Sequence, residues 1–85
     1  MTVTTQFKRF DIVRIREDCQ AHNWTTPEIG FINWVVPVTD TPYELLPIEW
    51  REPMMRGETP EFAERVFASI WCTADAFEPT QEVKP

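Results

Sequence analysis

The sequence predicts an all-β domain, a small barrel of four to five strands with a short helical turn near its C-terminus. Three observations predict this class. Short segments rich in β-branched and aromatic residues recur along the 85-residue chain. Turns containing some of the eight prolines separate these segments. Eleven aromatic residues can fill a compact core without a metal or a disulfide.

Residues 10–17 form the first predicted strand. Val13 and Ile15 alternate with Arg14 and Arg16. Because successive side chains of a strand point to opposite faces, we expect the two apolar residues in the core and the two arginines in solvent.

The second predicted strand covers residues 29–36 and is apolar on both faces. This pattern indicates a central strand, or an outer face covered by other residues or by a second copy of the chain. Ile32 and Trp34 share the face that we expect toward the core. Gly30 indicates a bulge or a close approach of backbone at the start of the strand.

Residues 43–50 form the third predicted strand, with Leu46 and Ile48 facing the core. Pro47 cannot donate a ladder hydrogen bond, so it favours an edge strand or a bulge. Residues 51–60 are expected to form a long excursion without regular structure.

Residues 61–78 permit two interpretations. Thr59-Pro60-Glu61 is typical of a helix start, and Phe62 and Val66 recur at a spacing of four. However, residues 65–72 contain more strand formers than helix formers. We therefore expect a strand at 65–72, followed by a helical turn at 73–77.

The chain is expected to hold one domain at residues 8–80, between a flexible lead-in at 1–7 and a flexible tail at 81–85. The predicted core combines the inward-facing residues of the four strands: Val13, Ile15, Ile32, Trp34, Leu46, Ile48, Ala68 and Ile70.

The net charge of −6 is unevenly distributed. Residues 1–16 carry four basic residues and one acid, whereas residues 17–85 carry four basic residues and thirteen acids. An acidic chain is an unlikely nucleic-acid binder, and no apolar run is long enough to cross a membrane. Two cysteines and an N-terminus without a signal-peptide pattern predict a cytoplasmic protein.

The order of these features resembles the SH3-like barrels of accessory subunits. Examples are photosystem I reaction-centre subunit IV, the variable chain of ferredoxin–thioredoxin reductase and the C-terminal part of the nitrile hydratase beta subunit. The resemblance rests on Asp11 before alternating apolar and basic residues, Gly30 at the second strand, and the Glu78-Pro79 exit after a helical turn. It implies a non-enzymatic barrel that docks on a larger assembly.

Two motifs were considered as chemical sites. Cys19-x-x-His22 and Cys72-x-x-Asp75 contain ligand types that zinc accepts, but structural zinc sites favour four Cys or His ligands. Cys19 and His22 lack a glycine cluster for an oxyanion hole. We therefore expect neither a metal, nor a cofactor, nor catalysis.

Loop hydrophobes are the candidates for a partner-binding site. Trp24, Met54 and Met55 lie in predicted loops, with Arg14 and Arg16 on the flank. Tryptophan and methionine suit protein contacts, whereas in the alternative interpretation the same loops fold back and plug one end of the barrel. We expect an interaction module or accessory subunit that binds another protein. The alternative is an acidic inhibitor that imitates nucleic acid.

Overall fold

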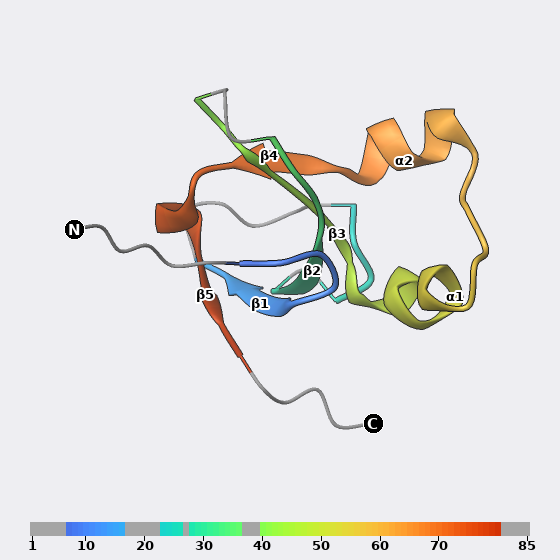
Figure 1. Cartoon of the computed structure of the whole chain (residues 1–85), viewed down its shortest axis with the longest axis horizontal. Coiled ribbons are helices and arrows are strands. Elements are labelled where there is room, and N and C mark those ends of the chain that lie inside the picture. Colours follow the sequence, from blue (N-terminus) through green and yellow to red (C-terminus); the bar gives the residue numbers. More distant parts are fainter. Residues whose placement is uncertain (1–6, 17–22, 27, 37–39, 81–85) are drawn as a thin grey trace.

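The computed structural model describes residues 7–16, 23–26, 28–36 and 40–80. Within them, five antiparallel strands form a curled half-barrel: β1 (Ile12–Ile15), β2 (Ile29–Val35), β3 (Tyr43–Pro47), β4 (Ile70–Cys72) and β5 (Phe77–Pro79) (Figure 1). Two short helices, α1 (Arg51–Met55) and α2 (Phe62–Ala68), and 3-10 turns at Ile48–Trp50 (η2) and Ala74–Ala76 (η3) complete the fold. The predicted all-β class is confirmed, and the arrangement is compatible with an SH3-like fold.

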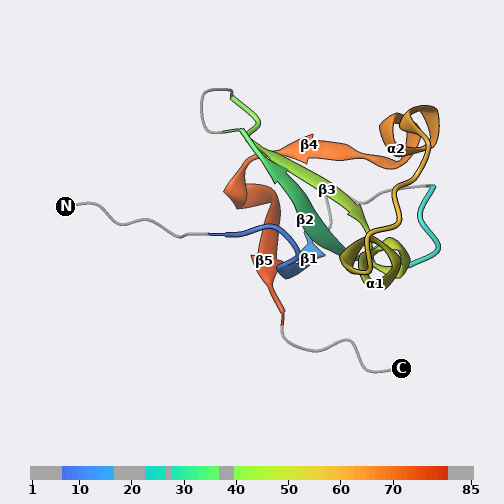
Figure 2. The ribbon, with the colours of Figure 1, turned by 45° about the vertical axis from the view of Figure 1, so that its right-hand side comes forward.

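The strand order is β4-β3-β2-β1-β5. Strands β1 to β4 pair in sequence order, and β5 returns to pair with the other edge of β1. The turn η3 changes the direction of the chain between β4 and β5, which confirms the helical turn expected at 73–77 (Figure 2). The sequence did not predict β5, because three residues in a polar tail carry no strand pattern of their own.

The first strand follows its sequence pattern. Val13 and Ile15 are buried, and Arg14 and Arg16 are exposed. Each arginine forms an ion pair with an acid, Arg14 with Glu28 at 3.2 Å and Arg16 with Glu78 at 3.8 Å.

The second strand contains an irregularity that reverses one prediction. Ile32 pairs with Leu45 and Trp34 with Glu44, so Asn33 is an extra residue in β2. The extra residue moves Trp34 to the outer face of the sheet, where its exposed fraction is 50%. The expectation that Trp34 lies in the core beside Ile32 is wrong for this reason.

The third strand ends earlier than predicted. It stops at Pro47, and the chain continues through η2 into α1 where a strand end and an irregular excursion were expected. Strand β3 lies between β2 and β4, so it is not an edge strand. Pro47 is tolerated because it is the last residue of β3, and Pro53 because it lies in the first turn of α1.

The strand predicted over residues 65–72 is present only at its C-terminal end. Residues 62–68 form α2, and only residues 70–72 form β4. The β-branched and aromatic residues at 66 and 67 are largely exposed, so burial in a sheet does not compete with the helix there.

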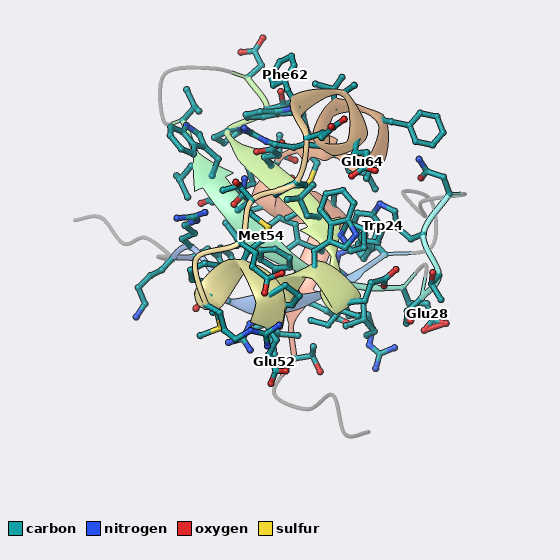
Figure 3. The ribbon with its side chains drawn as sticks, turned by 90° about the vertical axis from the view of Figure 1, so that its right-hand side faces the viewer. Trp24, Glu28, Glu52, Met54, Phe62 and Glu64 are labelled. Atoms are coloured by element: carbon teal, nitrogen blue, oxygen red, sulfur yellow. The ribbon has the colours of Figure 1, made fainter. Side chains whose placement is uncertain are left out.

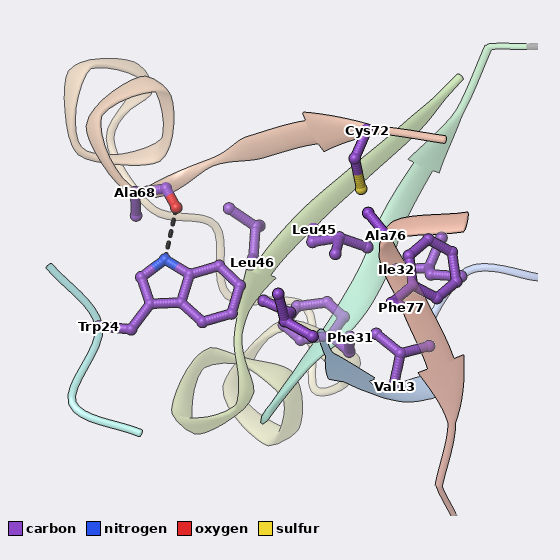
Figure 4. Close-up of a cluster of buried hydrophobic side chains, with 11 residues drawn as sticks. Val13, Trp24, Phe31, Ile32, Leu45, Leu46, Ala68, Cys72, Ala76 and Phe77 are labelled. Atoms are coloured by element: carbon purple, nitrogen blue, oxygen red, sulfur yellow. Dashed lines mark hydrogen bonds between the residues drawn. The ribbon is translucent and has the colours of Figure 1, made fainter. Parts of the chain in front are cut away.

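The core contains eleven buried apolar residues (Figure 4): Val13, Ile15, Trp24, Phe31, Ile32, Leu45, Leu46, Ala68, Cys72, Ala76 and Phe77. Five predicted core residues are among them, and Ile48 and Ile70 pack against the cluster while partly exposed. Phe31 points to the opposite face of β2 from Ile32, and the Phe10 ring covers it by stacking with ring centroids 5.8 Å apart. Phe7, in the expected lead-in, packs edge-to-face on Phe77.

Candidate functional site

Trp24 lies in the core, as in the interpretation that its loop plugs one end of the barrel. Its exposed fraction is 5%, and its indole N–H donates to the Ala68 carbonyl at 2.6 Å (Figure 4). The ring packs against Gly30, where a Cβ would lie 2.6 Å from the indole. This contact is the close approach that Gly30 predicted. A side chain so buried offers a partner almost no area.

The two methionines of α1 differ in exposure. Met54 is partly buried and lines a groove between α1 and α2, whereas Met55 is 51% exposed. Both therefore keep some surface that a partner could contact.

Arg14 and Arg16 are occupied by internal contacts. Besides its pairing with Glu78, Arg16 donates from Nε to the Asp75 carbonyl at 2.8 Å. Cross-strand pairing of this kind was the structural alternative to a binding role, and it leaves little unmatched positive charge on β1.

Of the four residues with side chains that zinc accepts, only Cys72 and Asp75 lie in the part of the chain that the structure describes. Cys19 and His22 lie outside those residues. Cys72 is buried in the core, and Asp75 is exposed on η3. Among the described side chains, no three His, Cys, Asp or Glu groups gather as metal ligands.

A different set of residues forms the most conspicuous surface. Strand pairing places Glu44 of β3 opposite Trp34 of β2 on one side and Trp71 of β4 on the other. Residues directly opposite in adjacent strands point to the same face, so the three side chains form one row on the outer face. Trp34 and Trp71 are 50% and 43% exposed, whereas Glu44 between them is 2% exposed.

Hydrogen bonds satisfy the buried carboxylate. Arg65 of α2 donates from Nε and Nη2 to the two oxygens of Glu44, at 3.0 and 2.8 Å. The Asn33 amide donates to the same carboxylate at 3.0 Å and accepts from Arg9 at 3.1 and 3.2 Å. The bonds to Glu44 raise the pKa of Arg65 against the opposing effect of its desolvation. The centre of the row is therefore electrically balanced.

The Arg65–Glu44 pair also fixes α2 over this part of the sheet. Phe62 and Val66, 74% and 55% exposed, flank Arg65 in the helix. Phe62 lies three residues before Arg65 and four before Val66, so it is a neighbour of both on the helix surface. We call Trp34, Phe62, Val66 and Trp71 together the aromatic face.

Sequence reasoning missed this surface for two reasons. The bulge at Asn33 has no signal in the β2 pattern. The helical spacing of Phe62 and Val66 was noted, but the strand interpretation was preferred over it. Giving more weight to the helix-start residues 59–61 would have indicated that Phe62 and Val66 share an exposed side.

Comparisons with protein-family models, with curated proteins and with solved structures give no match to this chain. No helix in the described part of the chain is long and apolar enough to cross a membrane.

Proposed function

We propose that the protein is a non-catalytic interaction module that docks on a partner protein through the aromatic face. The observation that carries the proposal is the exposure of four large apolar side chains around one balanced, partly buried ion pair. Scattered exposed apolar residues are ordinary on a protein surface, but a contiguous group of this size is typical of interaction sites. Two of the four are tryptophans, which often dominate the binding free energy of interfaces.

The charge of the face defines the chemistry of its partner. Glu44 is neutralised by Arg65, and the four apolar side chains carry no charge. Matching a face of this kind requires an apolar patch with few charges at its centre. The proposed partner is therefore a protein with such a patch, such as a larger subunit on which this domain is mounted.

Site-specific photocrosslinking tests the proposal. A photoreactive phenylalanine analogue replaces Phe62 in one variant and exposed Glu52 of α1 in a control, and each is irradiated in the native extract. We expect position 62 to crosslink to one defined protein, which is then purified and bound in vitro. Trp71→Ala and Phe62→Ala should each weaken that binding by about tenfold or more.

Three results would contradict the docking proposal. Crosslinks of equal yield from positions 52 and 62 would indicate unspecific contact. Crosslinks from position 62 only to a second copy of this chain would replace the foreign partner with a homo-oligomer. Unchanged affinity of both alanine variants for the purified partner would remove the aromatic face from the interface.

An acidic inhibitor that imitates nucleic acid is the second candidate. Five exposed glutamates lie between residues 49 and 64, which gives this region a concentrated negative charge. Competition distinguishes the two functions: an inhibitor of this kind is displaced from its partner by duplex DNA or RNA, whereas docking through the aromatic face is not.

A further inference from the structure

A groove on another side of α2 suggests a second binding site, independent of the aromatic face. It lies between α1 and α2, with a volume of about 440 Å³. This is within the range of pockets that hold small ligands or single side chains, about 300–1,000 Å³. Most of its lining is apolar and comes from η2, α1, α2 and the segment between the helices: Pro47, Trp50, Pro53, Met54, Pro60 and Phe67.

Fixed contacts hold the walls of the groove. The Asn23 amide donates to the Phe67 carbonyl at 2.8 Å, and the Trp24 indole donates to the Ala68 carbonyl at 2.6 Å. These bonds join the end of α2 to the segment before β2. Figure 3 looks onto this side of the molecule, with Met54 on α1 and Glu64 on α2. The α2 side of the groove is therefore held in place by hydrogen bonds within the protein.

The charge of the groove is all of one sign. Glu49, Glu58 and Glu64 line it, and none of its lining residues, all within the described part of the chain, is Lys or Arg. Glu58 pairs with Arg56 at 3.3 Å. Glu49 and Glu64 make no ion pair or side-chain hydrogen bond with another described residue. Two carboxylates without a counter-charge among the described residues thus line the same groove as Trp50 and Phe67.

We infer that this groove binds an arginine side chain presented by a protein. The combination of an aromatic, apolar interior and unpaired carboxylates favours a cation that also has a flat face. A guanidinium group stacks on aromatic rings and donates two parallel hydrogen bonds to a carboxylate, whereas an ammonium group is compact and strongly hydrated. Charge complementarity excludes an acidic segment, and an apolar side chain would leave the carboxylates unmatched.

Titration with blocked tripeptides tests the inference on the full chain. The probes are acetyl-Gly-Arg-Gly-amide, its lysine analogue and its citrulline analogue, which has the shape of arginine without its charge. Each is titrated to about 10 mM, which reaches dissociation constants in the millimolar range. Amide and indole N–H correlation spectra report binding. We expect the arginine peptide to shift the Trp50 indole signal and to leave those of Trp34 and Trp71 in place.

Two double variants with the same change in charge provide the matched control. Glu49→Gln/Glu64→Gln removes both unpaired carboxylates of the groove, while Glu52→Gln/Glu61→Gln removes two exposed carboxylates that do not line it. We expect the first double variant to lower the affinity for the arginine peptide by about tenfold and the second by less than about twofold. The dispersion of the spectra shows that each variant is folded.

Several outcomes would overturn the arginine site. The absence of any shift at the highest peptide concentration would show that the groove does not bind arginine. Equal binding of the citrulline peptide would show that binding does not depend on a positive charge. Equal affinity of the lysine peptide would remove the preference for arginine. Equal weakening in both double variants would reduce the effect to net charge. None of these results bears on the aromatic face, whose residues remain unchanged in all variants.

Discussion

Glu44 is the residue on which the outer face depends. A carboxylate that is 2% exposed is costly to bury unless hydrogen bonds replace its water. Here Arg65 and Asn33 supply these bonds, and among the described residues no buried side-chain nitrogen or oxygen lacks a partner. The pair therefore fixes α2 relative to the sheet. It does not follow that the pair adds net stability to the fold.

Removing one partner of this pair should be more harmful than removing both. Arg65→Met leaves the Glu44 carboxylate buried without its main partner, and we expect a loss of about 3 kcal/mol in the free energy of unfolding. The double variant Glu44→Leu/Arg65→Met leaves no buried charge but removes the acceptor of the buried Asn33 amide, so it should lose about 1 kcal/mol, less than the single variant. Urea denaturation followed by circular dichroism measures both. Equal losses in the single and double variants would contradict this account.

Gly30 should resist substitution because of what surrounds it. A Cβ at this position would lie 2.6 Å from the Trp24 ring and 2.7 Å from the Leu46 carbonyl oxygen. Because one of these neighbours is backbone, relief requires movement of β3, and we expect Gly30→Ala to cost about 1–3 kcal/mol.

Gly57 is the control for Gly30, since the space around it is open but its φ is +99°. Gly57→Ala should cost about 1 kcal/mol through backbone strain alone. The two variants also differ in where they act: only Gly30→Ala should shift the indole N–H signal of Trp24. An unchanged Trp24 signal in a folded Gly30→Ala protein would show that the ring does not pack there.

At the level of elements, α2 is short and lacks a side-chain cap. Glu61 occupies its N-cap with φ −65° and ψ 148°, but its side chain makes no capping hydrogen bond. Glutamate is one methylene too long for the favoured geometry, which aspartate and serine adopt. The position of α2 thus depends on Arg65 and on the bonds from Asn23 and Trp24 to its C-terminal end, rather than on a cap at its N-terminus.

Glu61→Asp should therefore stabilise the protein by about 0.5–1 kcal/mol without a change in charge. The matched substitution Glu64→Asp lies in the first turn of the helix, where it adds no cap and shortens the side chain, and should cost at most about 0.5 kcal/mol. Thermal denaturation of the two variants gives the comparison. If both lower the melting temperature, Glu61 is not the N-cap.

Elements were predictable where the local pattern and the tertiary environment agree. The alternation of Val13 and Ile15 with the arginines gives β1, because one face of that strand is buried and the other is solvated. The strand predicted at 65–72 is wrong for residues 65–68, because strand propensity acts only when side chains pack on a sheet. Here Phe62, Val66 and Phe67 remain exposed. The helix at residues 51–55 was not predicted, because Pro47 and Pro53 argue against regular structure and the helix has only about one turn.

The candidate site was less predictable than the fold. Trp24 stood out because it lies in a polar stretch, yet that stretch folds back so that its indole closes the core. Trp34 appeared to belong to the core until one extra residue in β2 reversed its direction. Long-range pairing decides both outcomes, and a local pattern of apolar residues carries no information about it.

Over the described part of the molecule, the two proposed sites differ in their charge. The aromatic face surrounds a balanced ion pair, while the α1–α2 groove holds carboxylates without a counter-charge. A net charge of −6 attracts basic partners from a distance, but screening by salt limits this attraction to short range. The two proposed sites should therefore respond to salt in different ways.

Raising the salt concentration from about 0.01 M to about 0.15 M shortens the Debye length from about 30 Å to about 8 Å. We expect this change to lower the affinity of the groove for the arginine peptide by about threefold or more, because its ion pairs lie close to solvent. Binding of the purified partner to the aromatic face should change by less than about twofold, since apolar burial does not depend on screening. Titration calorimetry at both concentrations measures the two effects. A partner whose affinity collapses with salt would assign its docking to the acidic surface, and with it the function of an inhibitor.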